Sequence, residues 1–188
     1  MKVRPAAVVL VADSSPLIVF ARVEQLAVLW GVTGGVVVPR TVWRECTETD
    51  GRPGAPALQQ AQAQGWIRVL DDALALSALR PLPSLDAGET AAIALALELQ
   101  ATVLMDERLG REVAQRRGLA VVGSAGVLLQ AKRKGLLPAV APVLARMKAE
   151  GYFLSDVLVR EVLRRAGEAL RPLKPRSRSP PPSPAADP

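Results

Sequence analysis

The sequence predicts an α/β domain in which helices flank a mainly parallel central sheet. Short strand-like segments, several of them continuous apolar runs, lie at 7–11, 36–38, 66–70, 102–105 and 120–122 and alternate with longer segments of helical composition. Uninterrupted apolar runs are typical of strands buried on both faces, and their alternation with helices is typical of a parallel sheet. Hydrophobic residues make up 49% of the 188 residues, which is enough to form one hydrophobic core.

Prolines and glycines mark the elements of the first half. Pro16 and Pro39 each stand where a helical pattern begins, a position at which the missing amide of proline leaves no hydrogen bond unmade. Gly35 and Gly65 each stand where a helical pattern ends and a strand begins. The expected elements are a helix over 16–30 that continues irregularly to its end, a strand over 36–38, a helix over 39–46, a helix over 55–64 and a strand over 66–70.

The second half begins with the clearest helix, 86–99, which is rich in alanine and leucine. Asp86 and Glu89 have the spacing of a capping box, and Leu85 could act as its hydrophobic staple. Ser124 is expected to cap a helix that begins at Ala125. The other expected elements are strands over 102–105 and 120–122 and helices over 108–117, about 138–150 and 155–167.

We expect one domain over residues 1–168, with a C-terminal helical extension at about 138–168. The stretch 171–188 holds 7 of the 16 prolines together with alternating arginine and serine. Proline removes backbone donors and restricts the residue before it, so a tail over 169–188 is expected to be disordered.

Histidine is absent from the chain. Its absence excludes serine and cysteine triads, histidine zinc sites and histidine general bases. Carboxylates that work without histidine usually hold a hard cation such as Mg²⁺. Cys46 is the single cysteine, which excludes a disulfide scaffold. The longest uncharged runs fall short of the ~20 residues that a membrane-spanning helix needs, and we expect a cytoplasmic protein.

Charge is unevenly distributed along the chain. Residues 1–100 carry 8 basic and 10 acidic side chains, whereas residues 101–188 carry 16 basic and 8 acidic side chains. A basic half beside an acidic half could form a polyanion-binding surface near a cation site. The alternative is a solvated, arginine-rich helical surface with no specific partner.

Acidic residues follow two of the predicted strands. Asp13 comes directly after the first strand, and Asp106, with Glu107 beside it, comes after a later one. The carboxyl ends of parallel strands lie at one edge of the sheet, so we expect both aspartates there. Glu45 and Glu89 lie early in helices whose N-termini could approach the same edge.

Each of these acidic residues also has a structural interpretation. Asp13 and Asp106 could cap the helices that follow them, Glu89 could belong to the capping box, and Glu45 could be a solvated helix residue. Four clustered carboxylates, however, repel one another unless a cation or a proton compensates them. The set therefore favours a cation site.

The same residues carry a resemblance to PIN-domain proteins, the family that includes the VapC toxins. The matching segments are VADSSPL (11–17), VPRTVWRE (38–45), DAGETAAIALA (86–96) and LMDER (104–108) through VGSAGVL (122–128). The segments 154–156 and 165–168 resemble one little-studied PIN branch of nucleic-acid-binding proteins. The resemblance covers nearly all of 7–168, is carried by the ordered set rather than by one motif, and implies a PIN-like three-layer fold.

The resemblance implies a metal-dependent ribonuclease that uses one or two Mg²⁺ or Mn²⁺ ions. The implied catalytic and metal-holding residues are Asp13, Glu45, Glu89 and Asp106, with Glu107 as an auxiliary ligand and Ser14 and Ser15 in support. The chain departs from the VapC pattern at Glu89, where aspartate is common, and at Leu104-Met105, where a threonine commonly stands. The resemblance also implies the toxin half of a toxin–antitoxin pair, a homodimer, and a small antitoxin that inserts residues into the acidic cleft.

Basic residues of the second half are candidates for contact with RNA phosphates. The main candidates are Arg108, Arg111, Lys132 and Arg133, and further ones are Arg116, Arg117 and Lys134. Aromatic residues make up only 3% of the chain, so we expect recognition through shape and backbone rather than through base stacking.

Three other classes of protein place acidic residues in a similar layout. A response-regulator receiver needs a lysine at a late strand end, and residues 122–124 lack one. A haloacid-dehalogenase-like phosphatase needs Asp-x-Asp after the first strand, and Asp13-Ser14-Ser15 lacks the second aspartate. The remaining alternative is an inactive PIN scaffold that binds RNA or protein without cutting, against which the complete acidic set argues.

Overall fold

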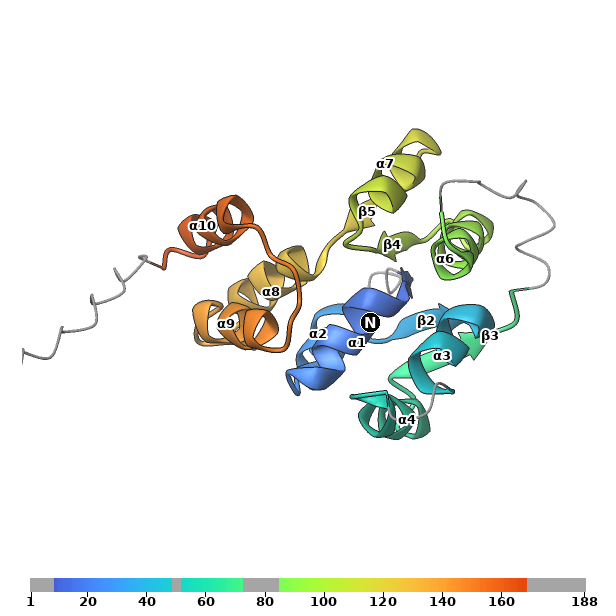
Figure 1. The fold of residues 1–188 in the computed structure, drawn as a ribbon, viewed down its shortest axis with the longest axis horizontal. Coiled ribbons are helices and arrows are strands. Elements are labelled where there is room, and N and C mark those ends of the chain that lie inside the picture. The colour runs from blue at the N-terminus through green and yellow to red at the C-terminus, as the bar shows by residue number, and fades with distance from the viewer. Residues whose placement is uncertain (1–8, 49–51, 73–84, 169–188) are drawn as a thin grey trace, which may run out of the picture.

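The computed structural model of the chain describes residues 9–48, 52–72 and 85–168 (Figure 1). Its strands are β1 (Leu10–Ala12), β2 (Val36–Pro39), β3 (Ile67–Leu70), β4 (Thr102–Leu104) and β5 (Val121–Val122). Its helices are α1 (Ser14–Arg22), α2 (Leu26–Thr33), α3 (Arg40–Thr47), α4 (Ala55–Ala63), α6 (Ala87–Glu98), α7 (Arg108–Arg116), α8 (Ser124–Arg133), α9 (Ala141–Ala149) and α10 (Asp156–Arg165). The start of the first predicted strand and the expected tail over 169–188 lie outside the described residues. In the part of the chain that is described, no helix is long and apolar enough to cross a membrane.

The five strands of the described residues form one parallel sheet in the order β3-β2-β1-β4-β5, which confirms the predicted fold class. Val11 on the central strand pairs with Val37 of β2 on one side and with Val103 of β4 on the other. All residues of β1 and β2 are buried, as expected for strands covered by helices on both faces.

Helices cover both faces of the sheet. α6 packs on β1, β2 and β4 with α7 beside it, whereas α1 packs against α2 and α4, and α2 packs against α8 (Figure 1). Right-handed crossovers explain the two layers, because the chain moves outward from β1 to β3 in one direction and from β4 to β5 in the other. The direction changes between β1 and β4, and ligands bind at the carboxyl ends of such a strand pair.

The helical segment expected over 16–30 is two helices, so a single helix there was wrong. Between α1 and α2, Glu24 adopts a left-handed conformation with φ of +58°. The amide of Glu24 donates to the Ala21 carbonyl at 3.1 Å, and the amide of Gln25 donates to the Phe20 carbonyl at 2.8 Å. These two bonds form a Schellman motif, in which glycine usually takes the left-handed position. A glutamate there left no sequence signal for the break.

Glu168 joins the end of the C-terminal helical extension to the start of that extension and to α8. Its carboxylate accepts hydrogen bonds from the amides of Val140 at 2.6 Å and Ala141 at 2.8 Å, at the start of α9, and from Nζ of Lys132 at 2.7 Å. Burial by itself raises the pKa of Glu168, but the Lys132 ammonium and the two amides outweigh it and hold the pKa below its usual value. A carboxylate at a helix N-terminus also interacts favourably with the helix dipole.

Candidate active site

Asp13 lies directly after β1, at the carboxyl edge of the sheet. Its backbone amide donates to the Leu104 carbonyl at 3.0 Å, which joins the end of β1 to the end of β4. Asp13 stands at the N-cap of α1, but its side chain forms no capping hydrogen bond there. The residue is only 2% exposed, and Oδ1 has no hydrogen-bond partner among the described residues. Helix capping therefore does not explain why a carboxylate is buried at this position.

Other carboxylates lie close enough to Asp13 to change its ionisation. The pKa of Asp13 is raised to about 7, chiefly by burial, against which the backbone amide of Ser14 acts, and also by the charges of Asp86, Glu89 and Glu45. The structure thus brings Asp13, Glu45 and Glu89 to one place. Asp86, which the sequence suggested only as a helix cap, joins this group.

Glu89 uses its two carboxylate oxygens differently. The Glu89 amide donates to Oδ1 of Asp86 at 2.7 Å, and the Asp86 amide donates to Oε2 of Glu89 at 3.1 Å, which confirms the capping box of α6. Oε1 is buried and has no partner among the described residues, and a Cβ on Gly110 would lie 2.9 Å from it. Burial raises the pKa of Glu89, and the charges of Asp86 and Glu107 contribute. Oε2 therefore takes part in capping α6, whereas Oε1 is free to accept a ligand.

Glu45 reaches the same edge from α3 and is half-buried. A Cβ on Gly88 would overlap its carboxylate, so the side chain lies directly against the bare backbone at the start of α6. Burial raises the pKa of Glu45 and the charge of Asp86 adds to this, while the Ser14 hydroxyl and the Gly88 amide lower it in part. Ser14 therefore lies beside this carboxylate, whereas Ser15 is exposed.

Asp106, two residues after β4, is held by three donors. The amide of Ser124 donates to Oδ1 at 2.9 Å, and the hydroxyls of Ser124 and Tyr152 each donate to Oδ2 at 2.5 Å. The prediction that Ser124 caps the following helix was wrong. α8 begins at Ser124 itself, with Gly123 at the N-cap, because the Asp106 carboxylate engages both the amide and the hydroxyl of Ser124.

Tyr152 is the site residue that the sequence analysis missed. It lies between α9 and α10 and is the single tyrosine of the chain. Burial raises the pKa of its hydroxyl far above the usual value, and the charge of Asp106 adds to this, so the group is a protonated donor. Asp106 and Tyr152 are 46 positions apart and no motif links them, so only the fold could reveal the contact.

The acidic and basic residues at the start of α7 are mostly solvated. Glu107 stands at the N-cap of α7 without a capping hydrogen bond and is exposed, and its charge raises the pKa of Glu89. Nε of Arg108 donates to Glu112 at 2.9 Å in an exposed ion pair. Exposed pairs of this kind are weak, so Arg108 could exchange Glu112 for a phosphate.

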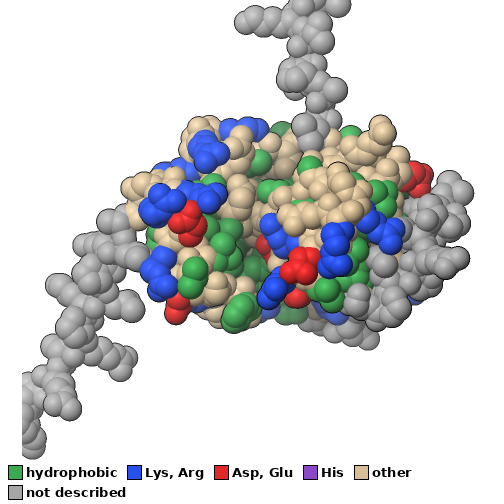
Figure 2. Space-filling view, turned by 90° about the horizontal axis from the view of Figure 1, so that it is seen from above, with side chains coloured by type: hydrophobic (Ala, Val, Ile, Leu, Met, Phe, Trp, Pro, Cys, Tyr) green, Lys and Arg blue, Asp and Glu red, His purple; other side chains and the backbone are tan. Residues whose placement is uncertain are grey.

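Arg111 places a basic side chain beside Asp106. Its Nη1 donates to the Met105 carbonyl at 2.8 Å, directly before the aspartate. Arg111 and Asp106 both line a cavity of about 420 Å³ that extends to Leu158 and Arg165 of α10. Figure 2 shows this side of the molecule, on which Lys and Arg side chains gather in two groups with a hollow between them.

The two basic candidates at the end of α8 lie in different surroundings. Lys132 is committed to the partly buried ion pair with Glu168, at 2.7 Å, and therefore has a structural role. Arg133 is exposed. Of the two, Arg133 is the one with a side chain open to a ligand.

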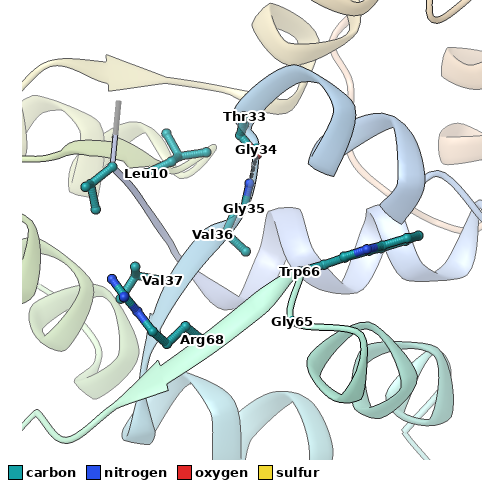
Figure 3. Close-up of a pocket in the computed structure, with 10 residues that line it drawn as sticks. Leu10, Thr33, Gly34, Gly35, Val36, Val37, Gly65, Trp66 and Arg68 are labelled. Carbon is teal, nitrogen blue, oxygen red and sulfur yellow. Dashed lines mark hydrogen bonds between the residues drawn. The ribbon is translucent and has the colours of Figure 1, made fainter. Parts of the chain in front are cut away.

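A second cavity lies at the opposite end of the strands. It has a volume of about 270 Å³ and lies at the start of β1, β2 and β3, between Gly34, Gly65, Trp66 and Arg68 (Figure 3). Trp66 stacks on Trp30 beside it, with ring centroids 5.3 Å apart. Its described lining includes no carboxylate, so it lacks the chemistry of the acidic edge.

The donor atoms of the acidic edge fit a hard divalent cation. Within the described ranges, no three Asp, Glu or Cys side chains form a ready-made cage for one ion. Asp13 Oδ1 and Glu89 Oε1 are nevertheless buried without a partner among those residues. Mg²⁺ is commonly held by only one or two carboxylates together with water, so these two oxygens suit it.

A parallel α/β domain with carboxylates gathered where its strand order reverses is an architecture that nuclease-type domains share with other α/β proteins. The model of a family described as a PIN domain matches residues 9–168. The match spans most of the chain, so the chain belongs to this PIN-domain family, whose members are generally nucleases. No curated protein matches the chain.

Proposed function

We propose that the protein is a metal-dependent endoribonuclease that hydrolyses RNA phosphodiester bonds. The observation that carries the proposal is a pair of buried oxygens in a PIN-family sheet, Asp13 Oδ1 and Glu89 Oε1, neither of which has a hydrogen-bond partner among the residues that the structure describes. A buried carboxylate oxygen without a partner is costly, and neighbouring carboxylates increase that cost. A divalent cation would satisfy both oxygens and offset the repulsion.

The proposed catalytic and metal-holding residues are Asp13, Glu45, Glu89 and Asp106, with Glu107 as an auxiliary. A bound Mg²⁺ or Mn²⁺ would provide a water of lowered pKa and neutralise charge on the scissile phosphate. Asp13 and Glu89 offer the open oxygens, while Ser14 orients Glu45 and Ser124 orients Asp106.

Phosphate contacts are proposed for three arginines. Arg111 lines the cavity beside Asp106, and Arg108 and Arg133 are exposed. Guanidinium groups bind phosphate through paired hydrogen bonds, which would let Arg108 and Arg111 hold the RNA backbone at the acidic edge. Arg133 lies at the other end of α8 and would contact RNA away from that edge.

Cleavage of a labelled RNA with Mn²⁺, with Mg²⁺ and with EDTA tests the proposal. Glu89→Gln keeps the size of the side chain but removes its charge, and we expect at least a hundredfold slower cleavage. Glu98→Gln is the matched control, because Glu98 lies exposed on the same helix, and it should cut at the wild-type rate. Equal cleavage by Glu89→Gln, or undiminished cleavage in EDTA, would contradict the proposal. RNA binding without cleavage by the wild type would support an inactive PIN scaffold instead.

We further propose that the protein is the cytoplasmic toxin of a toxin–antitoxin pair and forms a homodimer with which a small antitoxin associates. The resemblance to VapC toxins supports this proposal. Expression of the chain alone should arrest growth, and co-expression of a small neighbouring reading frame should restore it. Light scattering at micromolar concentration should give twice the chain mass, and a monomer would contradict the dimer.

A further inference from the structure

We propose that Tyr152 is a positioning residue that fixes the Asp106 carboxylate, so that the C-terminal helical extension completes the site. The inference rests on the proposed function and deepens it, because it assigns a role to a residue outside the four acidic positions. The inference is based on two hydrogen bonds, in which the hydroxyls of Ser124 and Tyr152 both donate to Oδ2 of Asp106.

The two donors approach Asp106 from separate parts of the fold. Ser124 begins α8, directly after β5, and is fully buried, whereas Tyr152 comes from the turn between α9 and α10. Two hydrogen bonds from independently anchored elements restrict both rotation and translation of the carboxylate. A single neighbouring donor could not impose that restriction.

The backbone around Tyr152 is itself fixed. Gly151 has φ of +80°, its amide donates to the Lys148 carbonyl at 3.0 Å, and the Tyr152 amide donates to the Met147 carbonyl at 2.9 Å. These bonds form a Schellman motif at the end of α9, which turns the chain back toward the sheet. Met147 is fully buried, so the anchor of the tyrosine lies in the hydrophobic core.

The two oxygens of the Asp106 carboxylate differ in how many hydrogen-bond acceptor sites remain unused. Each carboxylate oxygen accepts about two hydrogen bonds, so Oδ2 of Asp106 is saturated by its two hydroxyl donors. Oδ1 accepts one bond, from the Ser124 amide, and keeps one acceptor site. That oxygen lies beside Gly123 and Arg111, since a Cβ on Gly123 would lie 2.7 Å from Oδ1 and 2.9 Å from the arginine Nη1. Asp106 therefore presents one oxygen, in one orientation, on the side of Arg111.

Tyr152→Phe tests the inference because it removes the hydroxyl and keeps the ring. Partners that orient metal ligands typically change metal affinity by 10–100-fold, so we expect Mn²⁺ affinity to fall about tenfold and RNA cleavage to slow. The matched control is Thr33→Val, which removes a partly buried hydroxyl bonded to the Leu29 carbonyl at the far end of the sheet. The control should lose stability without losing Mn²⁺ affinity.

A double-mutant cycle separates positioning from a general structural role. In an Asp106→Asn background, Tyr152→Phe should cause no further loss of Mn²⁺ affinity, because the group through which it acts is gone. Ser124→Ala removes the other hydroxyl on Oδ2 and should have an effect of the same sign. Melts in EDTA establish that each variant is folded.

The outcomes that overturn the inference differ from those that overturn the function. A wild type that binds Mn²⁺ and cuts RNA, with a Tyr152→Phe variant that does both equally well, overturns the positioning role alone. A Tyr152→Phe effect that persists in the Asp106→Asn background also overturns it. A wild type that neither binds Mn²⁺ nor cuts RNA overturns the proposed function and this inference with it.

Discussion

The Glu45 carboxylate lies so close to Gly88 that a Cβ on the glycine would overlap both carboxylate oxygens. Glu45 belongs to α3 and Gly88 to the first turn of α6, and these two helices pack against each other. A similar relationship places Gly110 of α7 against Oε1 of Glu89. The candidate site therefore depends on bare backbone as well as on acidic side chains.

Gly88→Ala should separate activity from stability. Alanine is favoured over glycine within a helix by about 1 kcal/mol, and the atoms nearest to its Cβ would belong to the end of the flexible Glu45 side chain. We expect an unchanged or higher Tm together with at least tenfold slower RNA cleavage and weaker Mn²⁺ binding. Gly31→Ala in α2, whose Cβ would lie nearest to the Leu136 side chain, is the control and should keep full activity. A fully active Gly88→Ala variant would show that Glu45 is dispensable.

Asp13 should make the stability of the metal-free protein fall as pH rises. Its pKa is raised from 3.8 to about 7, so between these values the folded state binds more protons than the unfolded state, and stability decreases with pH. At 1.36 kcal/mol per pKa unit the loss is at most about 4 kcal/mol, complete above pH 7 and absent below about 3.8. Urea unfolding in EDTA from pH 4 to 8 measures it. Asp13→Asn should make this slope shallower and leave the part that is due to Glu45 and Glu89, whose pKa values are also raised. An unchanged slope would mean that the Asp13 carboxylate is not buried as described.

Asp106→Asn should destabilise the metal-free protein, whereas Asp13→Asn should stabilise it at neutral pH. Repulsion among carboxylates alone predicts that neutralising any of them stabilises the metal-free protein. Asp106, however, accepts three hydrogen bonds through two oxygens, and an asparagine amide has a single acceptor oxygen, so at least one of these hydrogen bonds would lose its acceptor. We expect a loss of about 1–3 kcal/mol in EDTA, against a gain for Asp13→Asn at pH 7.5. Changes of the same sign in the two variants would refute this division of roles.

The sequence was sufficient for most of the fold because its signals there are local. Buried strands appear as apolar runs, as in β2, and the Asp86–Glu89 capping box begins α6 as its spacing predicts. The break at Glu24 left no such signal, since the left-handed residue of that Schellman motif is usually glycine.

Part of the candidate site could likewise be predicted from local sequence signals, and part of it could not. Asp13 and Asp106 could be placed at one edge of the sheet because strand ends imply their positions. Two contacts could not be predicted in this way: the hydrogen bond from Tyr152 to Asp106 and the ion pair of Lys132 with Glu168. Each joins residues far apart in the chain through helix packing, which no local pattern encodes. Lys132 also shows why charge alone is a poor guide, because a lysine suited to phosphate can equally serve an internal ion pair.

Glu168 should stabilise the domain at neutral pH and lose that effect in acid. Its pKa is held below the usual 4.5, so its contribution is present above pH 4.5 and lost as pH falls through the lowered value. Glu168→Gln removes the charge that pairs with Lys132 and faces the start of α9, and we expect it to cost about 1–3 kcal/mol at pH 7. Glu150→Gln is the matched control, because its exposed ion pair with Arg22 should contribute less than about 1 kcal/mol. Urea unfolding from pH 3 to 7 should show the Glu168→Gln curve approaching the wild-type curve toward pH 3. Equal stability of the two variants at pH 7 would show that Glu168 does not anchor the extension.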